Sequence, residues 1–269
     1  MVKKHSLTFE FQNTIKKKYT MSKIISLVGA NNATNVQVKQ STAMLCIEYS
    51  CLTADAATQA AVLTKMNNVL VDVDLQSKGL GTKNLLAKMP LGVLAEIYSS
   101  GDGVLDMSTV AATTLVRFSI EVGALGALDL NDQTTIVIET TGGEADTALD
   151  VFAVDYPVGS IAAVKCDKIR FSANAPQVVN AQSSTHLHLP VASTDNVEIN
   201  YRGGKVVTLE KKEIESWLVK GLGIVSNFKT ATTSGFINYY SIPITDAVSV
   251  KVTMTADVNG YMFNYVSAK

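Results

Sequence analysis

Apolar and polar residues alternate along most of the chain from about residue 24 onward, and this alternation is the pattern of half-buried β-strands. In 69–76 and 248–255 every second residue is apolar and most of the others are polar, so each segment has one buried and one wet face. Clusters of Gly, Asn, Asp, Ser and Thr separate the segments, as in sandwiches and jelly rolls. The pattern predicts sixteen short strands, at 22–28, 34–38, 43–50, 69–76, 114–122, 134–140, 148–155, 161–166, 168–172, 176–181, 186–192, 196–201, 222–228, 236–244, 248–255 and 260–266.

Three segments place apolar residues three or four positions apart instead, which predicts helices. In the last of them Ile214, Trp217 and Leu218 form one apolar stripe, and Gly221 follows as the expected C-cap. The predicted helices cover 56–66, 82–98 and 208–220.

The order of these elements repeats along the chain. In each half a strand leads through a glycine-containing turn to a helix, which Thr82 or Thr208 opens, and then to three further strands. VDVDLQ resembles VEINYR, and RFSIEV resembles YYSIPI. We interpret the repeat as an internal duplication; the alternative is a chance similarity among β-branched strands. A Pro and a Gly at 156–159 mark the boundary, which divides the chain into a basic arm (1–20), a first unit (21–157) and a second unit (158–269).

This element order resembles the double jelly-roll major capsid proteins of tailless icosahedral phages that enclose a membrane, and the chain length and small loops are most similar to those of corticoviruses. The resemblance covers about residues 22–269 and implies an all-β fold of two tandem eight-stranded jelly-roll barrels, each with a short inserted helix. A helix at 56–66 is one more than a minimal unit needs. The match is carried by the paired blocks 69–122 and 196–244 and by the terminal strand pairs 134–155 and 248–266.

The resemblance implies a structural protein of the virion capsid that folds in the host cytoplasm and is not an enzyme. Its partners would be two further copies in a homotrimer that forms a pseudo-hexagonal capsomer, neighbouring capsomers, minor capsid or vertex proteins, and the anionic lipid membrane beneath an icosahedral shell. A charged fraction of 17% and a net charge of -1 weaken the repulsion between closely packed copies. A β-sandwich module that binds a receptor or glycan, as in a spike, is the alternative, and only its limited assembly would distinguish it.

The first 20 residues carry five lysines against Glu10, so their net charge is about +4 without His5. Leu7, Phe9 and Phe11 alternate with polar residues, which predicts an amphipathic strand. We expect an arm that contacts a neighbouring subunit or anionic lipid, where each lysine contributes about 1 kcal/mol; an ordinary solvated terminus is the alternative. The lysines are Lys3, Lys4, Lys16, Lys17 and Lys18.

The sequence gives little sign of nucleic-acid binding, membrane spanning or catalysis. Only three arginines occur and the net charge is near zero, which argues against sequence-specific nucleic-acid binding. Cys46 and Cys51 are an odd number of positions apart, which predicts opposite faces of one strand and folding in a reducing compartment. No apolar run is long enough to span a bilayer, and no zinc-protease, nucleophile-elbow or phosphate-loop motif is present. Alternating strands also argue against an α/β enzyme, which would need strands that are apolar on both faces.

Metal sites have weak support. His186 and His188 share one strand face, but two histidines without a third ligand are more typical of a surface or an interface. We expect no required cofactor, and we expect that a structural calcium ion can bind to one of two oxygen-rich groups. These groups are Asp72 with Asp74, and Asp129 with Asn131 and Asp132.

Overall fold

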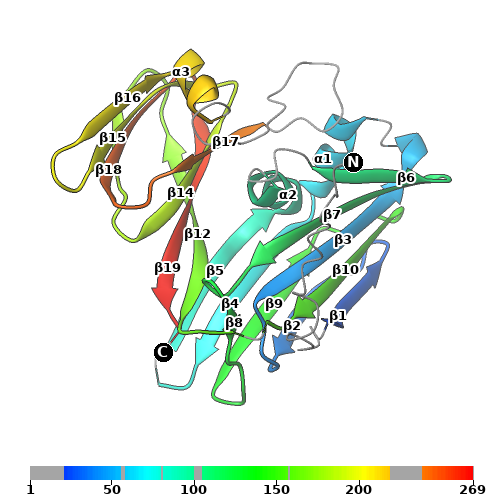
Figure 1. Cartoon of the computed structure of the whole chain (residues 1–269). Helices are drawn as coiled ribbons and strands as arrows, with labels where there is room; N and C mark the ends of the chain where they lie inside the picture. The colour runs from blue at the N-terminus through cyan, green and yellow to red at the C-terminus, as the bar shows by residue number, and fades with distance from the viewer. Residues whose placement is uncertain are drawn as a thin grey trace, which may run out of the picture.

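The structure is a computed structural model that describes residues 21–55, 58–79, 81–99, 105–156, 158–218 and 238–268. These residues are mostly β-strand (Figure 1). None of the helices among them is long and apolar enough to cross a membrane. We call residues 21–156 the first half and residues 158–268 the second half.

The elements of the two halves are as follows, in chain order. The first half contains β1 (Met21–Val28), β2 (Ala33–Val38), β3 (Met44–Leu52), a 3-10 turn (Thr53–Asp55), α1 (Gln59–Met66), β4 (Leu70–Ser77), β5 (Gly81–Pro90), α2 (Leu91–Ser99), β6 (Asp106–Val110), β7 (Thr113–Glu121), β8 (Ala127–Leu128), β9 (Thr134–Thr141) and β10 (Thr147–Val154). The second half contains β11 (Gly159–Ser160), β12 (Ala162–Phe171), β13 (Gln177–Asn180), β14 (Ser184–Pro190), β15 (Thr194–Tyr201), β16 (Val206–Glu210), α3 (Lys211–Ser216), β17 (Tyr239–Pro243), β18 (Ala247–Met254) and β19 (Val258–Ser267).

The described strands form three main sheets and one short parallel pair, β8 with β11. Sheet 1 has five strands in the order β1-β10-β3-β7-β6. Sheet 2 has eight strands, in the order β17-β14-β19-β12-β5-β4-β9-β2, and sheet 3 has four, in the order β13-β18-β15-β16. Sheet 2 belongs to both halves, which join where β12 runs parallel to β5 at Cys166 and Leu86.

The two halves share one strand order once the short strands β6, β8 and β11 are set aside. The first, eighth, third and sixth strands form β1-β10-β3-β7 in the first half and β12-β19-β14-β17 in the second. The second, seventh, fourth and fifth strands form β2-β9-β4-β5 and β13-β18-β15-β16. A helix follows the fifth strand in both halves, α2 after β5 and α3 after β16. The repeated element order of the sequence is therefore repeated in space.

Buried apolar side chains form two clusters. The first contains residues of the first half from Ile25 to Ala153 and a few of the second half, and the second contains Phe171 and the inward residues of β14, β15, β17 and β18. Cys166 and Tyr261 lie on second-half strands, yet they belong to the first cluster. The face of sheet 2 that points away from the second cluster therefore packs against the first half.

Helix α2 contributes to this contact between the halves. The Tyr98 ring lies against the Phe263 ring of β19, with centroids 4.8 Å apart. The buried Glu96 carboxylate accepts hydrogen bonds from the backbone N–H, at 3.2 Å, and the side-chain amide of Asn238. These polar and aromatic contacts fix the second half against the helix end of the first.

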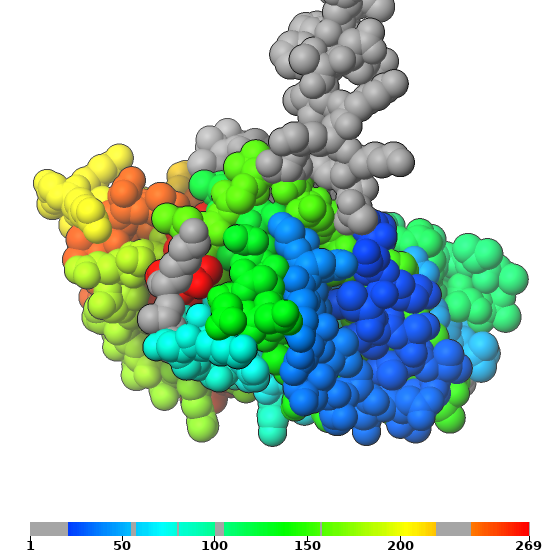
Figure 2. Space-filling model, turned by 90° about the horizontal axis from the view of Figure 1, so that it is seen from below, coloured from blue at the N-terminus to red at the C-terminus, as the bar shows by residue number. Residues whose placement is uncertain are grey.

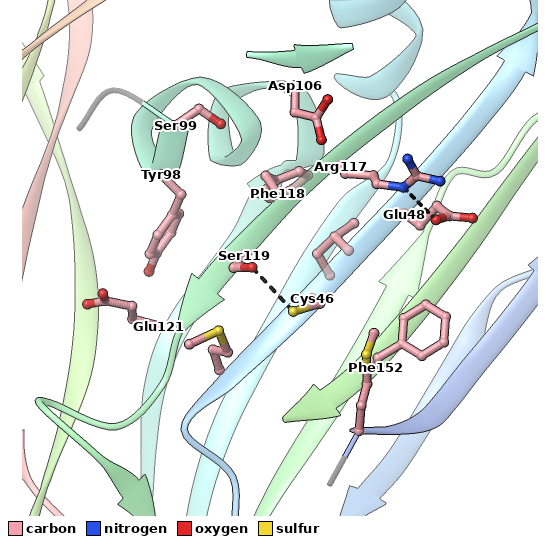
Figure 3. A pocket seen from close by; sticks show the side chains of 13 residues that line it. Cys46, Glu48, Tyr98, Ser99, Asp106, Arg117, Phe118, Ser119, Glu121 and Phe152 are labelled. Carbon is pink, nitrogen blue, oxygen red and sulfur yellow. Dashed lines mark hydrogen bonds and ion pairs between the residues drawn. The ribbon is translucent and has the colours of Figure 1, made fainter. Parts of the chain in front are cut away.

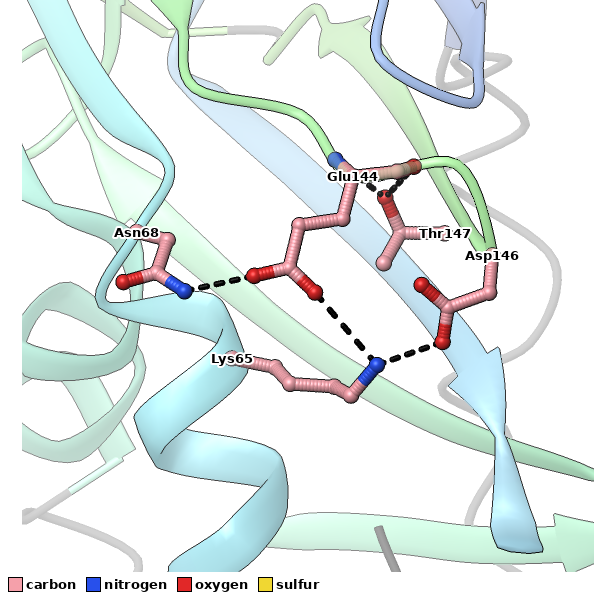
Figure 4. A network of polar contacts seen from close by, with 5 residues as sticks. All are labelled: Lys65, Asn68, Glu144, Asp146 and Thr147. Carbon is pink, nitrogen blue, oxygen red and sulfur yellow. Dashed lines mark hydrogen bonds and ion pairs between the residues drawn. The ribbon is translucent and has the colours of Figure 1, made fainter. Parts of the chain in front are cut away.

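Helix α1 is held to the turn between β9 and β10 by a charged network (Figure 4). Lys65 Nζ donates to Asp146 Oδ2 at 2.5 Å and to Glu144 Oε2 at 3.4 Å, while Asn68 Nδ2 donates to Glu144 Oε1 at 2.5 Å. The two carboxylates raise the pKa of the Lys65 ammonium, since its charged form is the one they stabilise.

Three predictions about elements are wrong. The first part of the predicted helix 82–98 is strand β5 (Gly81–Pro90), because register shifts opposite β4 turn the consecutive Leu85 and Leu86 both inward and so imitate helical spacing. Its second part is confirmed by α2 (Leu91–Ser99). Val206–Glu210 forms strand β16, and α3 begins only at Lys211. The predicted strands 161–166 and 168–172 are one strand, β12.

The other outcomes lie close to the predictions. Helix α1 (Gln59–Met66) confirms the predicted helix at 56–66 within its described residues. Strand β6 (Asp106–Val110) was not predicted. The predicted strand 222–228 and the end of the third helix, with Gly221, lie outside the described residues.

Candidate functional site

A hollow of about 690 Å³ lies on the outer face of sheet 1, the face that points away from the first apolar cluster. Figure 3 shows that its side chains come from strands β3, β7 and β10 and from the end of helix α2. Apolar and polar residues both line it: Met21, Met44, Cys46, Ile47, Glu48, Tyr98, Ser99, Asp106, Arg117, Phe118, Ser119, Glu121 and Phe152.

The polar groups of the hollow interact with one another. Arg117 Nε donates to Glu48 Oε2 at 2.9 Å, and Cys46 Sγ lies 3.3 Å from Ser119 Oγ. Cys46 is half-buried on this outer face, whereas Cys51 is buried in the core, so the prediction that the two cysteines lie on opposite strand faces is confirmed.

The three carboxylates among the lining residues, Glu48, Asp106 and Glu121, outnumber the single cation, Arg117, so the hollow has a net charge of about -2. Apolar surface lies between them. Lys23 Nζ lies over the Phe152 ring, 5.2 Å from its centroid. Met44 is half-buried on β3, which pairs with the Phe152 strand, β10. A face that combines apolar patches with an acidic rim is suited to contact another macromolecule.

The corresponding face of the second half is covered in part. Four of its outward residues, one on each of β14, β17, β19 and β12, are buried within the chain, and these strands hold the same places as β3, β7, β10 and β1. The exposed fractions are 1% for His188, 8% for Ser241, 3% for Tyr261 and 4% for Cys166.

Burial on that face changes the titration of its side chains. Loss of hydration lowers the pKa of His188 to about 3, with a smaller contribution from His186, and lowers the pKa of His186 as well. The same cause raises the pKa of Tyr261 to about 12 and raises that of the Cys166 thiol. These groups stay neutral near pH 7, as a dry contact between two packed layers requires.

The two histidines that were considered as metal ligands pack against other rings. The rings of His186 and His188 have centroids 6.3 Å apart, and the His188 ring packs against the Phe263 ring of the neighbouring strand at 4.4 Å. Within the described residues no group of three or more His, Cys, Asp or Glu side chains could hold a metal ion.

The two acidic groups are engaged with other protein atoms. Asn84 Nδ2 donates to Asp72 Oδ1 at 2.8 Å and to Asp74 Oδ1 at 2.9 Å, so the two carboxylates share a face as predicted. Asp132 Oδ1 pairs with Lys39 Nζ at 2.9 Å. Asn131 Oδ1 accepts the backbone N–H of residue 133 at 2.7 Å, and Asp129 is exposed. Calcium binding stays a prediction.

The predicted arm is not described. Its residues 1–20, with Lys3, Lys4, Lys16, Lys17 and Lys18, lie outside the described part of the chain. The hollow, in turn, was missed by sequence reasoning. Its only signal is that Met44, Cys46 and Phe152 are apolar at positions of β3 and β10 where alternation predicts polar residues.

The fold has a counterpart among solved structures. The crystal structure of the major capsid protein P2 from bacteriophage PM2 matches with a TM-score of 0.57 over 93% of this chain and 97% of that chain, at 12% sequence identity. The chain shares the fold of a phage major capsid protein. The resemblance inferred from the element order is thus confirmed, for a fold that is mostly β with several sheets. No protein-family model and no curated protein matches the sequence.

Proposed function

We propose that this protein is a structural subunit of a virion capsid and has no enzymatic role. The single observation that carries the proposal is the match of nearly the whole chain, 93%, to nearly the whole P2 chain, 97%. A match to one domain of a larger protein would leave the assembly role without support, because folds are shared among unrelated functions.

Within this proposal each half is an eight-stranded jelly-roll barrel. The repeated neighbour order of the first, eighth, third and sixth strands, and of the second, seventh, fourth and fifth, supports this assignment. It is the order of a jelly roll, in which two sheets of four strands alternate along the chain. The helix after each fifth strand supports the idea that one ancestral barrel was duplicated.

The proposed assembly is a homotrimer whose six barrels form a pseudo-hexagonal capsomer. Neighbouring capsomers would tile an icosahedral shell, with minor capsid or vertex proteins at its special positions and an anionic membrane beneath it. The five arm lysines, Lys3, Lys4, Lys16, Lys17 and Lys18, would meet the lipid headgroups or a neighbouring subunit. Removing residues 2–20 should abolish binding to anionic liposomes; unchanged liposome binding and unchanged assembly would contradict the role of the arm.

A receptor- or glycan-binding module is the second candidate, because a tandem β-sandwich is also a common scaffold for recognition. The two proposals differ in assembly. Negative-stain microscopy of the concentrated protein should show trimers and hexagonal arrays if the chain forms a shell. A small oligomer that stays unchanged at every concentration, and that binds glycans in a binding screen, would favour the recognition module instead.

A further inference from the structure

Three neighbouring strands of sheet 2 place a row of polar side chains on one face. Lys165 on β12 is the direct cross-strand partner of Asn264 on β19, and Asn264 is in turn the partner of Ser184 on β14. Direct partners in antiparallel strands point to the same side of the sheet, with Cβ atoms about 5 Å apart. Asp167 lies two residues after Lys165 and therefore shares this face. An amine, a carboxylate, a carboxamide and a hydroxyl thus meet at one place.

The row lies at the edge of the second-half core. Ile169, the next residue of β12 on the same face, packs against the second apolar cluster. Figure 2, which views the molecule from below, shows the red end of β19 between cyan and green residues of the first half and yellow-green residues of the second. Strands β12 and β19 are the first and eighth strands of the second half, so a covalent bond between them would join the beginning of that half to its end.

One carboxylate holds both the amine and the amide of the row. Asp167 Oδ1 pairs with Lys165 Nζ at 2.7 Å, and Asp167 Oδ2 accepts a hydrogen bond from Asn264 Nδ2 at 2.5 Å. On the other side, Ser184 Oγ donates to Asn264 Oδ1 at 2.5 Å. The amine is therefore held next to a carboxamide whose nitrogen faces a proton acceptor and whose oxygen faces a hydroxyl donor.

These groups are the ones that the transfer of an amide requires. A carboxylate that accepts a proton from the ammonium leaves a neutral amine, which is a nucleophile. A hydroxyl that donates to the amide oxygen stabilises the negative charge that develops there during the attack. Ser184 is only 4% exposed, so its hydroxyl is held in place for this role.

We propose that Lys165 and Asn264 form an intramolecular amide bond, with Asp167 as the proton carrier. Asp167 takes a proton from Lys165 Nζ, and the neutral Nζ attacks Asn264 Cγ while Ser184 Oγ holds the oxygen. The Nζ–Cγ bond forms and the Cγ–Nδ2 bond breaks. Nζ gives up two of its three protons in all, and both leave with Nδ2 as an ammonium ion. No oxidant, reductant or cofactor takes part.

A similar cluster elsewhere in the chain serves as an internal comparison. Glu144 holds the Lys65 ammonium at 3.4 Å and the Asn68 amide at 2.5 Å. Lys65 is also bound by a second carboxylate, that of Asp146 at 2.5 Å, and the two carboxylates raise the pKa of Lys65 and keep it in its charged, unreactive form. Within the described residues Lys165 has an ion pair with one carboxylate only, so we expect a bond at Lys165 and none at Lys65.

The surroundings of the row set the pace of the reaction. The side chains of Lys165 and Asp167 are 35% and 37% exposed, so water still stabilises their charged forms and the bond forms slowly as the protein ages. Once formed, the bond closes the second half from its first strand to its last and restricts the unfolded chain as a disulfide does. This inference does not depend on the proposed capsid function.

Mass spectrometry of the whole chain tests the proposal. After correction for the substitution, the aged wild type should be about 17 Da lighter than Lys165→Arg, which is the mass of one ammonia molecule. Lys165→Arg keeps a cation beside Asp167 and removes the nucleophile. Lys251→Arg is the matched control, because Lys251 also pairs with a carboxylate of the neighbouring strand, that of Glu198 at 3.9 Å, and it should show the same loss as the wild type.

Tryptic digestion of the aged wild type locates the bond and needs no variant to fold. The digest should contain a branched peptide that joins residues 165 and 264. A wild type that keeps its full mass after prolonged storage overturns the proposal, as does a mass loss that persists in Lys165→Arg or a branched peptide at residues 65 and 68. Conversion of the Asn264 amide to a carboxylate without a branched peptide would show that water is the nucleophile and would also overturn it.

Discussion

Acid should destabilise this protein through one buried histidine. His188 is 1% exposed, its ring lies 4.4 Å from that of Phe263, and its pKa is lowered to about 3 in the folded chain. In the unfolded chain the pKa returns to the ordinary value of about 6.5. Above pH 6.5 the His188 side chain is neutral in both the folded and the unfolded chain, so it does not change the free energy of unfolding. As the pH falls from 6.5 toward 3, only the unfolded chain binds a proton at this residue, and the free energy of unfolding therefore decreases.

The size of the loss follows from the difference in proton binding. Each pH unit below 6.5 costs about 1.4 kcal/mol until the folded-state pKa is approached, so at pH 5 the folded chain is about 2 kcal/mol less stable for this residue alone. That is a large part of the stability of a typical domain, about 5–15 kcal/mol.

The assay compares the wild type with His188→Gln, which keeps a polar side chain and removes the titration. Urea unfolding at pH 8 and at pH 5 gives the two free energies of unfolding for each protein. We expect the wild type to lose about 2 kcal/mol more than His188→Gln between the two pH values. If both proteins lose the same amount, His188 is not held neutral by burial in the folded chain, and the packed contact that covers it is not as described.

Three further predictions address the joint between the halves, the charged network and calcium. Gly126→Ala should lower the free energy of unfolding by about 1–3 kcal/mol, because an added Cβ would lie 2.4 Å from Val158 O, whereas Gly159→Ala, with nothing within 4 Å, should be nearly neutral in the same urea titration. Lys65→Met should lower the melting temperature, because two carboxylates lose their partner, and high salt should narrow the difference from the wild type; a difference that does not respond to salt would contradict an ionic cause. If a structural calcium ion binds, added calcium should raise the melting temperature and a chelator should reverse the rise, while an unchanged value contradicts the prediction.

The sequence predicted most strands of this fold because their alternation is regular. Strands β4, β10 and β18 alternate buried and half-buried residues almost without fault, and their bounds lie within two residues of the predicted ones. The repeated element order supplied the duplication and, from it, the resemblance to double jelly-roll capsid proteins. Periodicity works here because each of these strands has one face on a core.

The fifth strand of each half escaped prediction for physical reasons. In β5 a register shift turns Leu85 and Leu86 to the same side, and Met89 then completes a helical spacing. In β16 only Leu209 is buried, so the strand shows no regular alternation of buried and exposed residues that the sequence could reveal. Both strands run directly into a helix, and the helical pattern therefore extended backward across them.

The hollow and the cover of its counterpart could not be read from the sequence, since both depend on contacts between distant segments. Ser119 and Ser241 are both serines in the sixth strand of their half, yet one lines an uncovered face and the other is buried. The difference comes only from the segments that pack against the outer face of each sheet, and the alternation of apolar and polar residues along one strand does not reveal them.

Cryo-electron microscopy of the isolated oligomer tests the central claim most directly. The account predicts a three-fold ring in which each chain contributes two barrels with the same strand order, so that six similar lobes surround the three-fold axis. A monomer, a two-fold dimer, or a ring whose lobes do not superimpose on one another would contradict it.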